Sequence, residues 1–237
     1  LLGIDDDVQE RAKGVDGVSA AVTDRSEDWQ PDDPQLPEAG DLTPATDIPP
    51  PPTAPEGADP FDGWLWGTEA IGVADAHEVT TGRREVRVGI IDTGVDADHP
   101  DLAPVLDTGL SRSFVSDLAD IDGPCEAQDC VDPVGEDDNG HGTHVAGTVA
   151  AAANGLGVTG VAPGVTLVDL RAGQDSGMFF LGPTVNALTY AADQEIDVVN
   201  MSYYVDPWLV ACSGGAQGDS PEQVAFQDVA IELMHRT

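Results

Sequence analysis

The sequence predicts an α/β protein with a doubly wound, mostly parallel sheet. Three short apolar runs, at residues 85–91, 165–170 and 196–201, are typical of buried strands. Segments of helical character alternate with them, at 74–79, from His141 onward, at 184–193 and after Ser220. Strands that alternate with helices pair in parallel, because each helix carries the chain back across the sheet.

The first 60 residues differ in character from the rest. Residues 5–13 are a candidate for a short polar helix, and 15–23 for a turn followed by a strand. Ten of the 18 prolines lie in 26–60, which predicts an extended polyproline linker. A ligand for a proline-binding module is the alternative, but no basic anchor residue stands beside the prolines, so a spacer is favoured. The globular pattern begins at about Phe61.

The last segment has the pattern of a helix start. In Ser220-Pro-Glu-Gln223 the serine can cap, the proline fits the first turn and the glutamine closes a capping box. The apolar side chains that follow share one helical face; they are Phe226, Val229, Ala230 and Leu233. We therefore expect a helix close to the end of the sequence.

The chain is strongly acidic, with 44 acidic and nine basic residues and a net charge of −35. A negative field of this size repels nucleic acid and anionic membrane surfaces. No apolar run in the sequence is long enough to cross a membrane. The charge favours a solvated surface over a dedicated basic partner. We expect no nucleic-acid partner and no membrane segment in this chain.

Two of the three cysteines lie close together in a polar loop. Cys125 and Cys130 bracket four residues and could close a small disulfide ring, which would indicate an oxidising compartment. Two free thiols or half of a metal site are the alternatives. A disulfide is favoured because no other Cys or His stands at metal-ligand spacing. Cys212 then has no partner in this sequence.

A carboxylate follows the first apolar strand. Val88-Gly-Ile-Ile-Asp92 ends on an aspartate, and the carboxyl ends of parallel strands are where open α/β sheets place their sites. A buried aspartate there can hold an imidazole in one tautomer and stabilise its charged form. The motif Asp92-Thr-Gly94 also marks aspartic proteases and simple polar turns, so by itself it leaves three interpretations open.

The second motif is Asn139-Gly-His-Gly-Thr-His-Val-Ala-Gly-Thr148. It predicts a tightly packed helix of small residues with His141 in the first turn, where the imidazole can face a cleft. A zinc pair on a helix needs i,i+4 spacing with a glutamate between, which His141 and His144 lack. A structural histidine at a helix start is the remaining alternative.

Together the two motifs resemble the subtilisin-like serine proteases. The resemblance continues through His99-Pro-Asp-Leu102, 154–163 and Asp197-Val-Val-Asn-Met-Ser202, and it covers about 61–237. It implies a subtilisin-like fold and a secreted endopeptidase of bacterial or actinobacterial type, and it disfavours an aspartic protease. Asp92 matches the orienting acid and His141 the general base of an Asp-His-Ser relay.

The resemblance also implies a structural calcium site, with no cofactor required for the chemistry. The matching positions are the side chains of Asp62, Asp101 and Asn154 and the backbone of Ala152, Leu156 and Val158. Carboxylates and loop carbonyls are the oxygen donors that Ca²⁺ prefers. A surface loop with scattered acidic residues is the alternative.

Two segments match the edges between which members of the family bind an extended peptide as an added strand. Their residues are Asp175, Ser176 and Gly177 in one, and Ser202, Tyr203 and Tyr204 in the other. Asp175 and Tyr204 stand where the family commonly has small residues. A bulky segment, Tyr-Tyr-Val-Asp-Pro-Trp, also replaces a glycine-rich one after Ser202. We therefore expect a narrow side-chain preference.

The nucleophile of the relay is missing from the sequence. None of the nine serines lies in the Gly-Thr-Ser setting of the family, and no strand ends in the Ala-Gly-Asn that supplies an oxyanion donor. Ser213 in Cys-Ser-Gly-Gly faintly resembles a chymotrypsin-type nucleophile, but a loop is favoured. We expect the N-terminal part of a peptidase, with a sheet incomplete on its C-terminal side and no activity of its own.

The resemblance divides the chain into a prodomain remnant (1–25), a linker (26–60) and the N-terminal portion of the peptidase domain (61–237). An N-terminal extension unrelated to inhibition is the alternative for the first segment. The implied protein is an extracellular monomer whose signal peptide is not in this sequence. Its partners would be a peptide or protein substrate and its own prodomain. A non-catalytic, peptide-binding module is the alternative function.

Overall fold

The computed structural model describes residues 58–125, 127 and 129–203. In this part of the chain four strands form a sheet in the order β2-β3-β1-β4, and they pair in parallel. The strands are β1 (Arg87–Ile90), β2 (Arg112–Ser113), β3 (Thr166–Arg171) and β4 (Val198–Asn200). The predicted α/β class with a mostly parallel sheet is confirmed.

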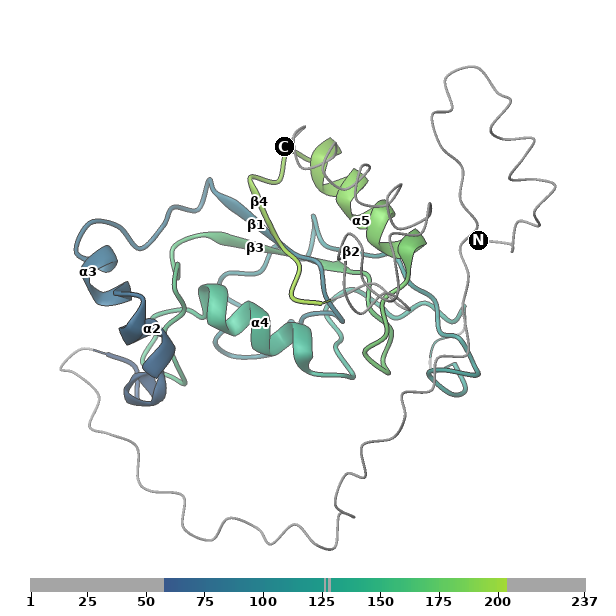
Figure 1. The fold of residues 1–237 in the computed structure, drawn as a ribbon, viewed down its shortest axis with the longest axis horizontal. Helices are drawn as coiled ribbons and strands as arrows, with labels where there is room; N and C mark the ends of the chain where they lie inside the picture. Colours follow the sequence, from purple (N-terminus) through teal and green to yellow (C-terminus); the bar gives the residue numbers. More distant parts are fainter. Residues whose placement is uncertain (1–57, 126, 128, 204–237) are drawn as a thin grey trace, which may run out of the picture.

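Helices cover both faces of this sheet. Figure 1 shows α4 (His141–Ala150) on one side of the strands and α5 (Leu181–Asp193) on the other. Three short helices precede β1, namely η1 (Asp62–Trp64), α2 (Trp66–Ala70) and α3 (Val73–His77). Among the described residues, no helix combines the length and the apolar character that a membrane span requires.

Successive residues of β3 contribute to two separate cores. Leu167 packs in a cluster with Ala146 and Ala150 of α4, whereas Val168 packs in a cluster with Ala187 and Leu188 of α5. Side chains alternate between the faces of a strand, so a sheet covered on both sides needs apolar residues at consecutive positions. This requirement explains why β1 and β3 appear in the sequence as unbroken apolar runs.

The predicted elements within 74–201 are present, with ends shifted by up to three residues. The expected helix at 74–79 is α3, and the one at 184–193 is α5, which begins earlier at Leu181. The sequence reasoning missed η1, α2 and β2, which are too short to produce a hydrophobic period. The helices expected at 5–13 and after Ser220, and the strand expected within 15–23, lie outside the described residues.

A carboxyl group is buried within β3. Asp169 is 1% exposed, and its Oδ1 has no hydrogen-bond partner among the described residues. Burial raises the pKa of Asp169 from 3.8 to about 8, although the nearby guanidinium of Arg171 opposes the rise. Asp169 therefore keeps its proton through most of the neutral range, and the core tolerates it as a neutral group.

The pKa of Asp169 makes stability depend on pH. Between pH ~4 and ~8 the folded chain holds a proton that the unfolded chain has released, so the free energy of unfolding falls as pH rises. The slope from this one group is at most about 1.4 kcal/mol per pH unit.

The Asp169→Asn variant tests this effect, because an asparagine side chain has no carboxyl proton to release. Its urea midpoint, measured at pH 5, 7 and 9, should fall less than that of the wild type. Asp120→Asn, at an exposed position, is the matched control. Equal pH dependence in Asp169→Asn and the wild type would contradict the assignment.

Candidate active site

The carboxyl end of β1 and the first turn of α4 bring Asp92 and His141 together. The distance from Asp92 Oδ1 to His141 Nδ1 is 2.7 Å. Asp92 is fully buried, whereas the side chain of His141 is 47% exposed. An ionised carboxylate only accepts hydrogen bonds, so Nδ1 carries the proton in this pair. The other ring nitrogen, Nε2, is then the basic one, which is the tautomer that a general base needs.

Glycine at position 142 allows this close approach. A Cβ atom on Gly142 would lie 2.1 Å from the carbonyl oxygen of Gly94 and 3.0 Å from Cβ of Asp92. The Gly142 N–H donates to Thr93 Oγ1 at 3.0 Å. The first turn of α4 therefore packs directly against the turn that follows β1. The Asp92-Thr-Gly segment and the His141-Gly segment form this contact.

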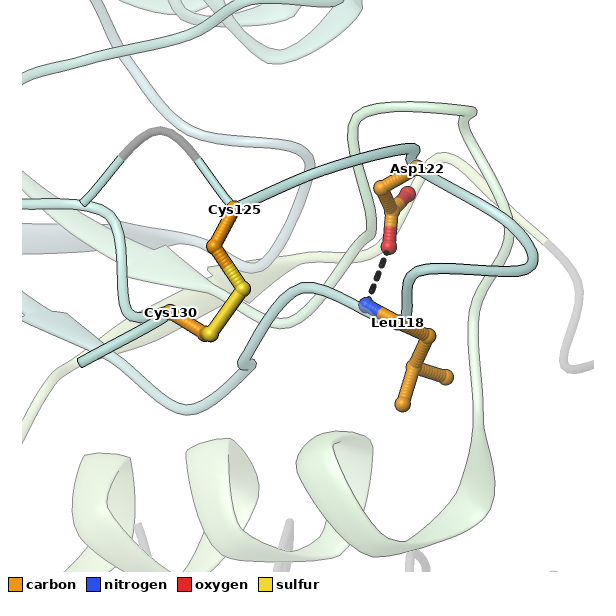
Figure 2. Close-up of a disulfide and its surroundings, with 4 residues drawn as sticks. All are labelled: Leu118, Asp122, Cys125 and Cys130. Atoms are coloured by element: carbon orange, nitrogen blue, oxygen red, sulfur yellow. Dashed lines mark hydrogen bonds between the residues drawn. A yellow bond between two sulfur atoms is a disulfide. The ribbon is translucent and has the colours of Figure 1, made fainter. Parts of the chain in front are cut away.

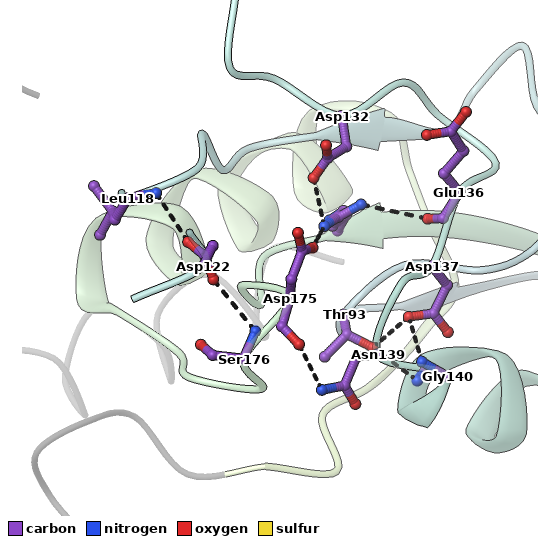
Figure 3. Close-up of polar contacts among 12 residues, drawn as sticks. Thr93, Leu118, Asp122, Asp132, Glu136, Asp137, Asn139, Gly140, Asp175 and Ser176 are labelled. Atoms are coloured by element: carbon purple, nitrogen blue, oxygen red, sulfur yellow. Dashed lines mark hydrogen bonds and ion pairs between the residues drawn. The ribbon is translucent and has the colours of Figure 1, made fainter. Parts of the chain in front are cut away.

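Asp137 ties the same two segments together. Its Oδ1 accepts hydrogen bonds from Thr93 Oγ1 at 2.8 Å and from the Gly140 N–H at 3.0 Å (Figure 3). Its Oδ2 accepts from the N–H and the hydroxyl of Thr143, at 2.8 and 2.6 Å. A carboxylate at a helix N-terminus also interacts favourably with the helix dipole. The sequence reasoning missed Asp137; an acid four residues before the histidine was the available signal.

The segment that contains Asp175, Ser176 and Gly177 lies next to Asp92. The Asp92 carbonyl accepts hydrogen bonds from the N–H groups of Ala172 and Gly173, at 2.9 and 3.0 Å. The chain then turns back on itself, since Gly173 forms an antiparallel bridge with Phe179. We call residues 173–177 the edge segment. Its position against the Asp92 carbonyl places it beside the Asp92–His141 pair.

Residues of the edge segment and of the 202–204 segment contact other protein groups in the structure. The carboxylate of Asp175 pairs with Arg171, and the Ser176 N–H donates to Asp122 Oδ1 at 3.2 Å (Figure 3). Ser202 Oγ donates to Asn200 Oδ1 at 2.8 Å. The ring of Tyr203 stacks on Phe179 with centroids 3.9 Å apart, and burial raises the pKa of Tyr203. The stack joins Tyr203 to Phe179, the bridge partner of Gly173 in the edge segment, and Tyr204 lies outside the described residues.

Known proteins resemble this chain in sequence. Residues 83–222, more than half of the chain, match the Subtilase family. The chain belongs to the subtilase family. It is 34% identical over 174 residues to the intracellular serine protease of Paenibacillus polymyxa. That match covers 66% of this chain and 49% of the Paenibacillus protein. It is 42% identical over 117 residues to subtilisin DY of Bacillus licheniformis, covering 49% and 36% of the two chains.

A solved structure supports the subtilase fold. The crystal structure of fervidolysin from Fervidobacterium pennivorans, a keratinolytic enzyme related to subtilisin, matches with a TM-score of 0.50 and 28% identity. The match covers 77% of this chain and 25% of fervidolysin. The curated relatives are serine proteases, and this subtilase spans about half of their length or less.

The positions expected to bind calcium lie together in this subtilase, around Asp101. Asp101 is 3% exposed, its Oδ2 accepts from the Val158 N–H at 3.2 Å, and its Oδ1 has no partner among the described residues. The Ala152 N–H donates to the Asp101 carbonyl at 2.9 Å. Asn154 Oδ1 accepts from the Leu156 N–H at 2.9 Å. The unpaired oxygen of Asp101 is the feature that a cation would satisfy.

Asp62 anchors the same loop through hydrogen bonds. Its Oδ1 accepts from the Thr159 N–H at 2.6 Å, and its Oδ2 accepts from the Asp59 N–H and the Thr159 hydroxyl. Buried Asp59, which the sequence reasoning missed, accepts from the N–H groups of Asn154 and Gly155 at 3.3 and 2.7 Å. The pair of acids three residues apart, Asp59 and Asp62, was the available signal. Both oxygens of Asp62 are already engaged, so Asp101 is the better cation ligand of the two.

Cys125 and Cys130 form a disulfide in the loop that precedes α4 (Figure 2). In the same loop Asp122 Oδ2 accepts from the Leu118 N–H at 2.9 Å. Next to this loop, carboxylate oxygens of Asp117, Asp132 and Asp175 lie within 4.8 Å of one another. The positive charge beside them is the guanidinium of Arg171, which pairs with Asp132 and Asp175.

The contact between Gly142 and Gly94 can be tested by adding one carbon. In Gly142→Ala the new Cβ meets backbone that cannot yield without moving α4. We expect a loss of about 1–3 kcal/mol in the free energy of unfolding, typical of overpacking, together with separation of His141 from Asp92. Chemical denaturation and the NMR chemical shifts of the His141 ring report the two effects.

Gly147→Ala is the matched control for this variant. Gly147 lies in the same helix, and a Cβ there meets nothing within 4 Å. Alanine is favoured over glycine inside a helix by about 1 kcal/mol, so this variant should be at least as stable as the wild type. Equal stability of the two variants would show that the approach of α4 to the β1 turn is not tight.

Proposed function

We propose that this chain carries the acid and the base of a serine endopeptidase. Asp92 would orient His141 and stabilise its charged form, and His141 would act as general base. The observation that carries the proposal is the 2.7 Å contact between a fully buried carboxylate and a half-exposed imidazole at the carboxyl end of the sheet. Its membership of the subtilase family supports the same reaction class.

The reaction would proceed through an acyl-enzyme. His141 Nε2 would accept the proton of a serine hydroxyl while that oxygen attacks the carbonyl carbon of the scissile peptide bond. The same proton would pass to the leaving amine, and water would then release the acyl group. We propose that the serine lies outside these 237 residues, because none of the nine serines has a Gly-Thr-Ser setting. The chain alone would then be inactive.

The proposed substrate is an extended peptide. It would add as a strand between the edge segment and the segment around Ser202. The contacts of Gly173 with the Asp92 carbonyl and of Asn200 with Ile91 support this, and backbone pairing is a common way to bind peptides. The charged Asp175 and the bulky Tyr203 and Tyr204 would narrow the side chains accepted. A peptide-library cleavage profile with no side-chain preference would oppose this part of the proposal.

We also propose the division of the chain into 1–25, 26–60 and 61–237, as prodomain remnant, linker and peptidase portion. The proline content of the middle segment and the family match within 83–222 support it. Limited proteolysis should cut first within 26–60. The prodomain would be a partner of a monomeric enzyme.

An extracellular location is proposed from the disulfide, since such bonds persist in oxidising compartments. Some relatives are named as intracellular, so the location needs its own test. Fractionation of the source cells, followed by alkylation without reduction, should find the protein outside the cells with Cys125 and Cys130 unlabelled. Intracellular protein with both thiols labelled would refute the location.

The experiment for the proposed function is labelling with a fluorophosphonate, applied to the product of the complete reading frame. We expect labelling of a serine and hydrolysis of a peptide p-nitroanilide. His141→Ala should lower kcat by about 10⁶-fold, the size of the loss in subtilisin, and Asp92→Asn by about 10⁴-fold. His144→Ala, exposed in the same helix, is the control and should keep wild-type activity. Peptide binding without labelling or hydrolysis would favour a non-catalytic module.

A structural calcium ion is proposed at Asp101, with Asn154 and loop carbonyls of Ala152, Leu156 and Val158 as further ligands. The ion would neutralise the buried carboxylate and stiffen the loop, and the chemistry would not need it. Calcium should raise the Tm of the wild type, and Asp101→Asn should remove most of that shift. Asp98→Asn, at a neighbouring exposed position, should leave it intact. A wild-type Tm that does not respond to calcium or to EDTA would exclude the site.

A further inference from the structure

Arg171 is a buried cation at the end of β3. Its side chain is 2% exposed, which is unusual for an arginine and requires charged partners. Nη2 lies 2.6 Å from Asp132 Oδ2 and also pairs with Asp175 Oδ1. Nη1 donates to the Glu136 carbonyl at 3.5 Å. One guanidinium thus joins the end of β3 to the edge segment that follows it and to the loop after the disulfide, which lies more than 30 residues earlier in the sequence.

The edge segment is in turn joined to the start of α4. Asn139 Nδ2 donates to the Asp175 carbonyl at 2.8 Å (Figure 3). Asn139 Oδ1 accepts from the His141 N–H at 3.3 Å. Both sides of Asp175 are therefore held, its carboxylate by Arg171 and its carbonyl by Asn139. A continuous set of polar contacts runs from Arg171 through Asp175 and Asn139 to the backbone of His141.

Around Arg171 the carboxylates outnumber the cations, so its positive charge is fully engaged by the neighbouring negative charges. Burial raises the pKa of Asp132 to about 6 and also raises that of Asp175, and Arg171 opposes both shifts. The other carboxylates that act on this pair are Asp117, Asp122 and Asp138. Without Arg171, Asp132 and Asp175 would repel each other, and the edge segment would lose the contact that holds it inward.

We propose that Arg171 is a positioning residue, which holds the edge segment in a fixed relation to the first turn of α4 and hence to His141. The inference rests on the proposed peptidase function and adds to it the residue that aligns the peptide-binding edge with the base. Arg171 does not touch the reacting atoms in this role; it acts through Asp175 and Asn139. A planar guanidinium suits the role because it can bind two carboxylates at once, which a lysine ammonium does less well.

The first arm of the test compares two substrates on the product of the complete reading frame. A tetrapeptide p-nitroanilide needs the edge segment, whereas p-nitrophenyl acetate is too short to reach it. Arg171→Met should lower kcat/KM for the peptide by about 10- to 100-fold, chiefly through KM, because small misplacements in a site have effects of this size. The rate with the ester should stay near that of the wild type, and Arg171→Lys should restore part of the loss. Equal losses for both substrates, or no loss with the peptide, would overturn the inference.

Two further variants control for folding. Asp175→Asn removes the charge from a partly exposed side chain without changing its size, and it should reproduce the selective loss with the peptide if Arg171→Met does not fold. Arg112→Met removes an arginine from the neighbouring strand β2, where its guanidinium donates to the carbonyls of Ser111 and Gly109 and lies over the ring of Tyr190. This variant should hydrolyse both substrates as the wild type does.

The second arm does not depend on catalysis. Hydrogen exchange in Arg171→Met should speed up at 173–177 and 137–141 and remain slow in β1 and α5. Uniform or unchanged exchange would overturn the positioning role. If the wild type hydrolyses neither substrate and takes no fluorophosphonate label, the peptidase function fails, while the exchange pattern still decides whether Arg171 holds the edge segment.

Discussion

The approach of α4 to the turn after β1 is the contact on which the site depends. Gly142 lies against the Gly94 carbonyl with no room for a side chain, and this contact lets His141 come within hydrogen-bond distance of Asp92. Asp137 strengthens the junction, since it bonds to Thr93 on one side and to Gly140 and Thr143 on the other. The pair is therefore as rigid as the two elements that carry it, which preorganises the imidazole for proton transfer.

Buried charge shapes the surroundings of this junction. Asp92 and Asp169 are both buried, one paired with an imidazole and the other holding its proton. Arg171 supplies the positive charge that lets Asp132 and Asp175 lie side by side. Burying each of these arrangements costs free energy and requires a specific geometry, because a buried charge is tolerated only with its partner in place. In the described part of this strongly acidic chain, the buried Arg171 thus brings together a disulfide-bearing loop and the edge segment beside His141.

Much of the fold could be predicted from local patterns, and the reasons are physical. The apolar runs at β1 and β3 must be buried on both faces, so they predict helices on each side of a parallel sheet. Asp92 and His141 stood out because each belongs to a motif at a strand end or a helix start. Asp137, Asp59 and Arg171 did not, since each depends on at least one partner far away in sequence, such as Thr93 for Asp137 and Asn154 for Asp59. For Arg171 that partner is Asp132, and although Asp175 is only four residues away, the two lie outside any helix, so neither pairing leaves a periodic signal.

The sequence by itself determined the fold class, the family resemblance and the two residues, Asp92 and His141, proposed as acid and base. It could do so because strand and helix periods and short glycine-containing motifs are local properties of the chain. Only the tertiary structure decided where the acidic side chains point: Asp62 toward Thr159, and Asp175 inward to Arg171. Those choices depend on which charges meet when β3, the loop after the disulfide and α4 pack together, and no residue carries that information alone.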